Sequence, residues 1–176
     1  DGQPFVTPTS YWRDGETVYV HGSSASRTLR DMGGGIEACL AVTHLDGMVL
    51  ARSGYHHSMN YRSVIMYGTA KPVTDPDEIL AALKIFMDQI TPGRWDECRP
   101  VNEQELKATC VLAMKLEDVS AKVRTGPPVD DEADYASPMW AGVVPIHTVA
   151  GDPIADPRLP DGVPAPDFAT SFKFTA

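Results

Sequence analysis

The chain has 176 residues, a length that fits one domain with a hydrophobic core. Asp and Glu number 24 against 15 Lys and Arg, so the formal net charge is −9. An acidic chain matches neither a phosphate backbone nor an anionic membrane surface, and we expect no nucleic acid and no membrane as partners. A local basic pocket for one phosphate is still compatible with this charge, because it needs only one or two cations.

The N-terminal part of the chain is typical of short strands joined by tight turns. The dipeptide Asp14-Gly15 is a hairpin signal between two apolar arms. Thr17, Tyr19 and His21 alternate with two valines, which indicates a half-buried strand. We expect strands at residues 3–7, 8–12, 17–21, 36–45, 48–52 and 62–73, with an Asp-Gly turn at residues 46–47.

The clearest helix is predicted over residues 76–90. Asp75 can cap its first turn, Pro76 suits the first helical position, and Glu78 would complete a capping box. Apolar residues then recur on one helical face, at Ile79, Leu83, Phe86, Met87 and Ile90. Further along the chain we expect a short helix at residues 102–108 and strands at residues 110–116 and 140–149.

These elements predict a mainly β fold with a few flanking helices. Strands joined by hairpins pair antiparallel, and strict strand–helix alternation is absent, which disfavours a doubly wound sheet. Closure into a small barrel would remove exposed strand edges. We expect one domain over residues 1–147, with the amphipathic helix inserted at about 76–90, and a Pro-rich extended tail over residues 148–176.

The first polar segment with chemical potential follows the strand that ends at His21. Small and hydroxyl residues lead into an expected helix start, where free backbone N–H groups and the helix dipole favour an anion. Ser23 and Ser26 add hydroxyl donors, and Arg27 adds a bidentate cation. The segment is a candidate cradle for a phosphate monoester, and the alternative is a serine-rich loop that caps a helix.

The second segment, residues 55–64, precedes the long strand. Arg62 and Ser63 could bind a phosphate, and Ser58 and Asn60 could donate hydrogen bonds to a heterocycle. The alternative is a solvated loop with a satisfied arginine. Two neighbouring histidines at 56–57 point oppositely in an extended chain, so they do not ligate one metal together, and we expect no metal site.

A local basic pair, Lys122 and Arg124, lies on one face of an extended segment. In an acidic protein this pair favours a phosphate or carboxylate partner, and the alternative is ion pairing with the acidic loop near Asp130. Trp140 could stack on a ring system or belong to the core. His44 lies within an apolar strand and is interpreted as a core or barrel-facing residue.

Cysteine usage and apolar run length bear on where the protein functions. Three cysteines are widely spaced without zinc-type spacing, and they indicate reduced thiols in a cytoplasmic protein. No apolar run approaches the roughly 18 residues of a membrane span, and no signal-peptide pattern is visible. We therefore expect a cytoplasmic location.

An ordered series of segments resembles the flavin-nucleotide-binding proteins related to pyridoxamine 5′-phosphate oxidase and to nitroimidazole-resistance reductases. The series covers about residues 1–147. It comprises residues 1–6 (DGQPFV), 18–23 (VYVHGS) with Ser26-Arg27, 58–64 (SMNYRSV) with Gly68, 92–95 (PGRW), 105–106 (EL), 120–128 (SAKVRTGPP) and 140–145 (WAGVVP). Each piece is weak alone, but their order is specific for this family.

The resemblance implies a six-stranded antiparallel split β-barrel of Greek-key topology that forms a homodimer, with FMN rather than FAD in a cleft between subunits. It also implies a helix and a strand before the segment that starts at Asp1. The residues carried over as flavin-binding are His21, Gly22, Ser23, Ser26, Arg27, Ser58, Asn60, Tyr61, Arg62, Ser63 and Val64, with Lys122, Arg124 and Trp140 as further candidates that reach the flavin of the other subunit.

The resemblance implies an FMN-dependent oxidoreductase that passes electrons from a nicotinamide cofactor to a small electrophile, such as a nitro compound or a quinone. His21 and then Tyr61 are the catalytic candidates. The substrate-binding arginine and histidine pattern of true pyridoxamine phosphate oxidases is not recognisable, so we do not expect that activity. The alternatives are a non-catalytic flavin-binding or storage module, and a haem or deazaflavin binder with His56 or His57 as haem ligand.

Overall fold

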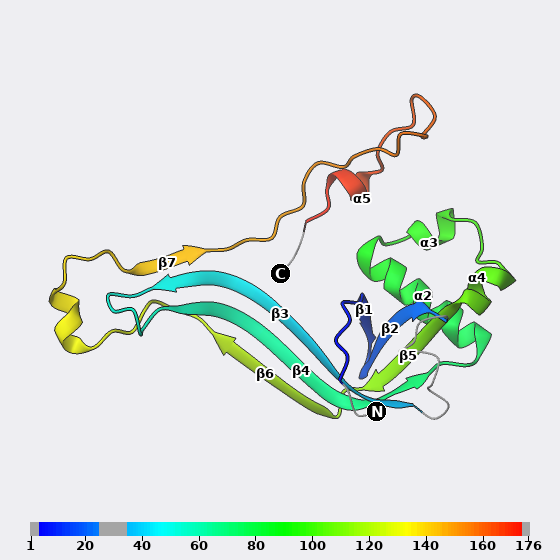
Figure 1. Ribbon diagram of the computed structural model, residues 1–176. Coiled ribbons are helices and arrows are strands. Elements are labelled where there is room, and N and C mark those ends of the chain that lie inside the picture. Colours follow the sequence, from blue (N-terminus) through cyan, green and yellow to red (C-terminus); the bar gives the residue numbers. More distant parts are fainter. Residues whose placement is uncertain (1–3, 25–34, 174–176) are drawn as a thin grey trace. The chain divides into compact units, whose positions relative to one another are not determined.

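The computed structural model describes residues 4–24 and 35–173 (Figure 1). The expected residues Ser26 and Arg27 lie outside these ranges. The chain divides into two compact units, the first formed by Asp1–Leu40 with Met66–Val119 and the second by Ala41–Ile65 with Ser120–Ala176. Two long strands, β3 (Ile36–Leu50) and β4 (Ser58–Pro72), contribute residues to both units.

The first unit contains a short antiparallel sheet covered by helices. Its strands include β1 (Tyr11–Asp14), β2 (Thr17–Ser23) and β5 (Thr109–Lys115), with β2 in the middle and β5 next to the end of β4. The registers are antiparallel: Trp12 opposes Tyr19, and Val20 opposes Leu112. The helices are α2 (Pro76–Ile90), α3 (Arg94–Glu97) and α4 (Glu103–Ala108).

Strands β2 and β5 are buried on both faces, because alternate residues enter two different hydrophobic clusters. On one face Val18, Leu112 and Met114 pack with Met66 and Ala70 of β4. On the other face Tyr19 and Val111 pack with Trp12 and with Ile79 and Ala82 of α2. The apolar face of α2 therefore lies against this sheet (Figure 1).

The predicted N-caps are confirmed at both helices, but the capping box expected from Glu78 does not form, because the Glu78 side chain makes no hydrogen bond to the Asp75 backbone N–H. The Asp75 carboxylate accepts hydrogen bonds from the backbone N–H groups of Asp77 and Glu78, at 2.9 and 3.0 Å, and α2 has the predicted bounds. The reciprocal contact of a capping box is present at α4, where Asn102 and Glu105 bond each other's backbone N–H groups.

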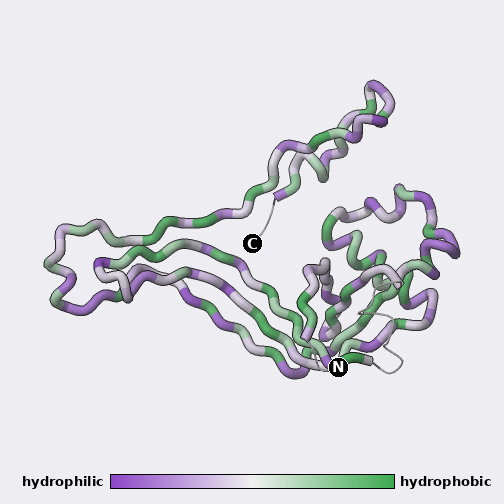
Figure 2. Tube along the Cα trace, viewed as in Figure 1, coloured by the Kyte–Doolittle hydropathy of each residue, from purple (hydrophilic) through white to green (hydrophobic). Residues whose placement is uncertain are grey.

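The second unit is built on the other halves of β3 and β4. Strand β6 (Asp118–Arg124) pairs with β4, and β7 (Gly142–Pro145) pairs antiparallel with β3, Val143 opposing Val49. A 3-10 turn, η1 (Glu132–Ala136), and a short helix, α5 (Asp167–Thr170), complete it. Along β6 hydrophobic and hydrophilic residues alternate, and no residue of this strand is buried (Figure 2).

The expected turn at Asp46-Gly47 is wrong, since both residues lie inside the continuous strand β3. Gly47 has another physical role. A Cβ atom at this position would lie 2.9 Å from a Val143 side-chain carbon and 3.1 Å from the Val144 carbonyl oxygen. The glycine therefore permits the close approach of β7. In the sequence alone, the same glycine indicates only a turn.

The mainly β, antiparallel class with a few helices is confirmed. In the described residues the sheet has seven strands, in the order β1-β2-β5-β4-β3-β7 with β6 beside β4, and it is not closed. These pairings do not confirm a six-stranded barrel, because β6 and β7 both pair with the long strands and no pairing joins β1 to β7 in this part of the chain.

No helix among the described residues is both long enough and apolar enough to cross a membrane.

Met66→Ala tests the first hydrophobic cluster. Met66 is 2% exposed, and its truncation leaves a cavity, which we expect to lower the free energy of unfolding by about 2–5 kcal/mol. The control is Tyr67→Ala on the next residue, which is 53% exposed and should change it by only about 0.5 kcal/mol. Urea unfolding followed by circular dichroism measures both, and equal losses would contradict the assigned core.

Candidate functional site

A polar cluster in the second unit joins the start of β4 to the end of β6. Asn60 is 8% exposed, and its side-chain amide donates a hydrogen bond to the Gly126 carbonyl oxygen at 3.0 Å. Its amide oxygen accepts a hydrogen bond from Nη1 of Arg124. Both ends of this buried amide are therefore satisfied, and Asn60 holds the Arg124 guanidinium in place.

Two cations on β6 have no carboxylate partner among the described residues. Lys122 places its ammonium nitrogen 5.8 Å from the centroid of the Tyr61 ring. Lys122 and Arg124 lie two residues apart, on the same face of an exposed strand. The acidic loop does not neutralise them, because Asp130 pairs with Arg52 instead. In a chain with a net charge of −9, this face is suited to an anion.

Arg62 already has an anionic partner. Its Nε and Nη2 donate to the two carboxylate oxygens of Asp46 on β3, at 3.0 and 2.9 Å. The hydrogen bond and charge of Arg62 hold the pKa of the Asp46 carboxyl below its ordinary value, and Asp46 raises the pKa of Arg62. Ser63 contacts the Thr43 hydroxyl at 3.1 Å. Arg62 and Ser63 project from opposite faces of β4, so one phosphate on either face meets only one of them.

The predicted residues of β2 lie in the first unit. The His21 ring packs 5.6 Å from that of Trp12 and 5.2 Å from that of Phe86, measured between centroids. Its Nδ1 is buried without a hydrogen-bond partner in the described part of the chain. Gly22 opposes Cys110 and Ser23 opposes Thr109 in the ladder between β2 and β5.

Three further candidates have contrasting surroundings in the second unit. Ser58 is the first residue of β4 and is half-buried, and Val64 on the same strand is 41% exposed. Trp140 is 65% exposed and lies before β7, so it is not a core residue. A Cβ atom on Gly142 would lie 2.9 Å from its indole ring, so glycine leaves room for the ring over the strand.

A cavity of about 400 Å³ in the second unit is lined by the predicted site residue Arg62 and by residues that the sequence analysis did not select as functional. Its lining combines two imidazoles, an ion pair and a few apolar or hydroxyl groups: Thr43, His44, Leu45, Asp46, Arg62, Ile146, His147 and Thr148. His44 was expected as a core or barrel-facing residue. Its spacing of two residues from Asp46 on one strand was the available signal, because it places both side chains on one face.

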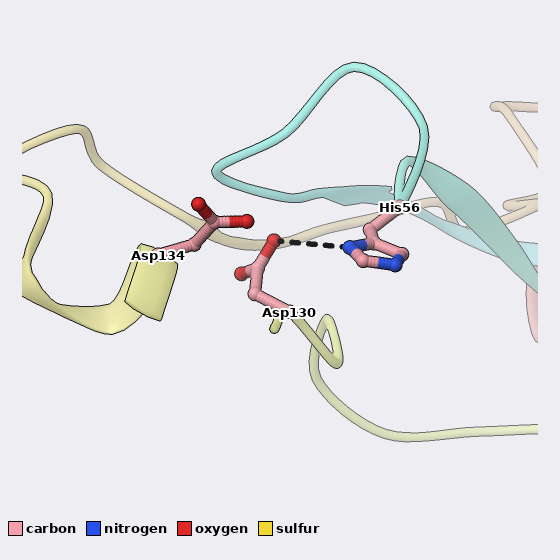
Figure 3. A group of neighbouring side chains, drawn as sticks. All are labelled: His56, Asp130 and Asp134. Atoms are coloured by element: carbon pink, nitrogen blue, oxygen red, sulfur yellow. Dashed lines mark ion pairs between the residues drawn. The ribbon is translucent and has the colours of Figure 1, made fainter. Parts of the chain in front are cut away.

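A second cluster, formed by His56, Asp130 and Asp134, has the composition of a metal site (Figure 3). One ligand atom from each lies within 4.8 Å of the others. Asp130 is already engaged, however: its two carboxylate oxygens accept from the Arg52 backbone N–H at 2.9 Å and from the Arg52 guanidinium at 3.0 Å. The cluster is accordingly an ion-pair network that joins the loop before β4 to the loop before η1.

The pKa of the Asp130 carboxyl reflects two opposing influences. Burial raises it, whereas hydrogen bonds from the Arg52 backbone N–H, the Arg52 guanidinium and the Ser53 N–H lower it, and the net pKa lies below the ordinary 3.8. A carboxylate with a lowered folded-state pKa stabilises the fold above its unfolded-state pKa. This stabilisation is lost as the pH falls through the folded-state value.

Asp130→Asn should therefore lower the melting temperature by several degrees at pH 7, because it leaves the Arg52 guanidinium half-buried without its carboxylate. The difference from the unmodified protein should shrink as the pH falls below about 4. The control is Asp131→Asn on the exposed neighbouring residue, which forms no ion pair in the described chain. Thermal melts from pH 7 to pH 3 measure the effect, and a difference that is constant over this range would contradict it.

Two solved structures of known proteins are similar to nearly the whole chain. The flavocytochrome Anf3 from Azotobacter vinelandii is 46% identical, over 95% of this chain and 78% of that chain, with a TM-score of 0.89. An FAD and haem binding protein from Mycobacterium smegmatis is 37% identical, over 95% of this chain and 82% of that chain, also with a TM-score of 0.89.

A protein from Bacteroides thetaiotaomicron, provisionally assigned to 5-nitroimidazole antibiotic resistance, is 18% identical with a TM-score of 0.52, over 68% of this chain and 69% of that chain, and shows the fold alone. No curated protein matches the chain significantly. The family model described as pyridoxamine 5′-phosphate oxidase matches residues 1–123. With two relatives above 30% identity over nearly the whole chain, the protein belongs to the pyridoxamine 5′-phosphate oxidase family.

Proposed function

We propose that this protein binds a flavin nucleotide and haem, and that it passes electrons through them. The observation that carries the flavin proposal is the cationic face of β6, where Lys122 and Arg124 have no carboxylate partner in the described chain. A phosphate is the anion that such a face suits, since guanidinium–phosphate hydrogen bonds are charge-assisted. Asn60 fixes the Arg124 side chain before any ligand arrives, which reduces the entropic cost of binding.

The two more similar relatives support the choice of cofactors. One is named a flavocytochrome and the other an FAD and haem binding protein. The sequence resemblance favours FMN, whereas the second relative is named for FAD. Both nucleotides carry a phosphate next to the ribityl chain, so the β6 cations suit either one. We also propose the six-stranded Greek-key split barrel that the family resemblance implies.

The proposed reaction takes electrons from a nicotinamide cofactor and delivers them to a small electrophile. The flavin supplies the redox chemistry, and the protein supplies binding, orientation and electrostatics. Tyr61 is a half-buried phenol next to the Lys122 ammonium and would lie at the edge of a flavin on β6. The proposed role of His21 would require its unpartnered Nδ1 to meet a ligand or water. Without turnover, the same pocket would serve flavin storage.

We also propose that the protein forms a homodimer with its flavin in a cleft between subunits. The second unit exposes apolar residues on its strands: Val123 of β6 is 62% exposed, and Met59 and Val64 of β4 are 43% and 41% exposed. Few residues of this unit are buried, among them Val49 and Ala51. Met59 and Val64 project from opposite faces of β4, so a second copy of the chain that covers one face of this sheet would remove part of this apolar surface from water.

The flavin proposal is tested with Lys122→Ala. Among the described residues the Lys122 ammonium contacts only the Tyr61 ring, so its removal takes no hydrogen bond from the fold. Loss of one charge-assisted contact should weaken flavin binding about tenfold to hundredfold. Titration of the apoprotein, followed by flavin fluorescence quenching, measures the dissociation constant, and chromatography of the released flavin distinguishes FMN from FAD.

The matched control is Lys107→Ala, which removes an exposed lysine that pairs with Glu103 on α4. It should leave the dissociation constant unchanged. Equal affinity for flavin in the Lys122→Ala and Lys107→Ala variants would contradict the assignment of the phosphate site to the β6 face. A protein without flavin absorbance would overturn flavin binding, and a flavoprotein that does not oxidise NADH or NADPH with a nitroaromatic or quinone acceptor would be a storage module.

The dimer proposal predicts a solution mass of twice the chain's 19.1 kDa. Val123→Asp would place a charge on the exposed apolar face of β6, where a subunit interface could not solvate it. We expect this variant to shift to a monomer in analytical ultracentrifugation. Asp118→Ala, on an exposed position at the other end of β6, should stay dimeric. A monomeric unmodified protein would contradict the proposal.

A further inference from the structure

We infer that the segment from Val149 to Asp167, which we call the C-terminal arm, packs against a second copy of this chain. The inference rests on the dimer part of the proposed function, and it adds the segment that joins the subunits and the surface that receives it. The arm begins beyond the contact with β3, where the Ile146 N–H donates to the Asp46 carbonyl oxygen at 3.0 Å. None of its residues belongs to a strand in the described structure.

The arm is exposed over its whole length, although several of its side chains are large and apolar. Its 19 consecutive residues are all exposed in the described structure. Large aliphatic residues recur every four or five positions, with Ile154 96% exposed and Val149 79% exposed, followed by Leu159 and Val163. Figure 2 shows hydrophobic residues spaced among hydrophilic ones along this part of the chain. Segments that stay disordered contain few β-branched residues, so this composition favours a segment that packs on another surface.

The described part of its own chain does not hold the arm. Its recorded backbone hydrogen bonds close two local turns, from the Leu159 N–H to the Asp156 carbonyl oxygen at 2.9 Å and from the Val163 N–H to the Pro160 carbonyl oxygen at 3.4 Å. Five prolines restrict its backbone, so docking costs the arm less conformational entropy than it would cost a flexible segment. The arm is therefore preorganised for a surface outside this part of its chain.

The length of the arm fits an interface between two copies of the chain. One side of a standard protein–protein interface contributes roughly 20 to 30 residues. The arm supplies 19 residues, which is close to the lower end of that range. In a two-fold symmetric dimer each chain gives one arm and receives one, so the same contact is made twice. A second copy of the chain is therefore the occupant that the size of the arm favours.

We assign the receiving surface to the apolar face of β6, formed by Ala121 and Val123. Val123 is 62% exposed, and no residue of β6 is buried. Charge favours this strand, because the arm carries four aspartates against Arg158, whereas Lys122 and Arg124 of β6 have no carboxylate partner in the described chain. These two cations lie on the opposite face of β6, so an arm on the apolar face leaves the proposed phosphate site open.

Ile154→Asp in the full chain tests the arm. Because Ile154 is 96% exposed, the substitution removes no core contact from a single chain, but it would place a charge in the proposed contact. We expect the dissociation constant of the dimer to rise about tenfold to hundredfold, the factor that burial of one such side chain supplies. Sedimentation equilibrium measures this constant. The matched control is Val6→Asp, at a residue of the first unit that is 98% exposed, and it should leave the constant unchanged.

Trypsin gives a second readout, because Arg158 is the only lysine or arginine of the arm. In the dimer the bond after Arg158 should be protected from cleavage. We expect the cleavage rate to rise at least about tenfold in Ile154→Asp, in Val123→Asp and on dilution below the dissociation constant, since cleavage follows the population of free arms. Mass spectrometry of the released C-terminal fragment measures the rate.

The outcomes separate the arm contact from the dimer itself. Rapid cleavage at Arg158 in a dimer, or an Ile154→Asp protein that dimerises as tightly as the Val6→Asp control, would overturn the arm contact and leave the dimer proposal intact. Protection that persists in a monomer would place the arm on its own chain and would also overturn the contact. A Val123→Asp dimer with a protected arm would overturn the assignment to β6. A monomeric unmodified protein would overturn the dimer proposal, and the arm contact with it.

Discussion

The bidentate ion pair between Asp46 and Arg62 ties β3 to β4 in a unit where hydrophobic burial is scarce. Its geometry has two consequences for the site. Because the Arg62 guanidinium is already paired with a carboxylate, the cations of β6, which have no carboxylate partner in the described chain, are the better candidates for binding an anion. Because the carboxylate is held in place, it presents a fixed negative group to His44 on the same face of β3. The Asp46–Arg62 pair therefore lies between the cationic face of β6 and the cavity that His44 and His147 line.

The two units use the same strand periodicity for opposite purposes. In β2 and β5, residues of both faces enter hydrophobic clusters, so both faces of these strands stabilise the fold. In β6 neither face is buried: the valines form one face, and Lys122 and Arg124 form the other. Under the proposed function, the cationic face of β6 would meet the cofactor and its apolar face would meet a second subunit, so one strand would serve both proposals.

Features with local physical causes could be predicted from the sequence. The helix at residues 76–90 has its cap and its apolar stripe within its own sequence. The cap agrees with the structure, and so does the stripe at Ile79, Leu83 and Phe86, whereas Ile90 is 45% exposed. Gly47 shows the limit: its turn signal was misleading because the glycine serves β7, which is about a hundred residues away in the chain. The family and the antiparallel class followed from the order of many weak segments, whereas the number of strands depended on pairings that no segment encodes alone.

The candidate site could be predicted as a set of residue types but not as a set of partners. Arg62 and Lys122 look equivalent in the sequence, yet one faces a carboxylate and the other does not, and only the strand pairing decides this. His56 and His57 lie in a polar loop, and the Nδ1 atom of each finds a partner in Ser53 of the same loop, which the sequence alone does not indicate.

Within the second unit, the strand order places β4 between β6 and β3. Neighbouring strands lie about 4.8 Å apart, so the cations of β6 and His44 of β3 are separated by about two strand spacings across the sheet. Asn60 of β4 accepts a hydrogen bond from Arg124 of β6, and Arg62 of β4 pairs with Asp46 of β3. The pairing of β4 with both neighbours therefore determines how the cationic face and the cavity are placed within this unit.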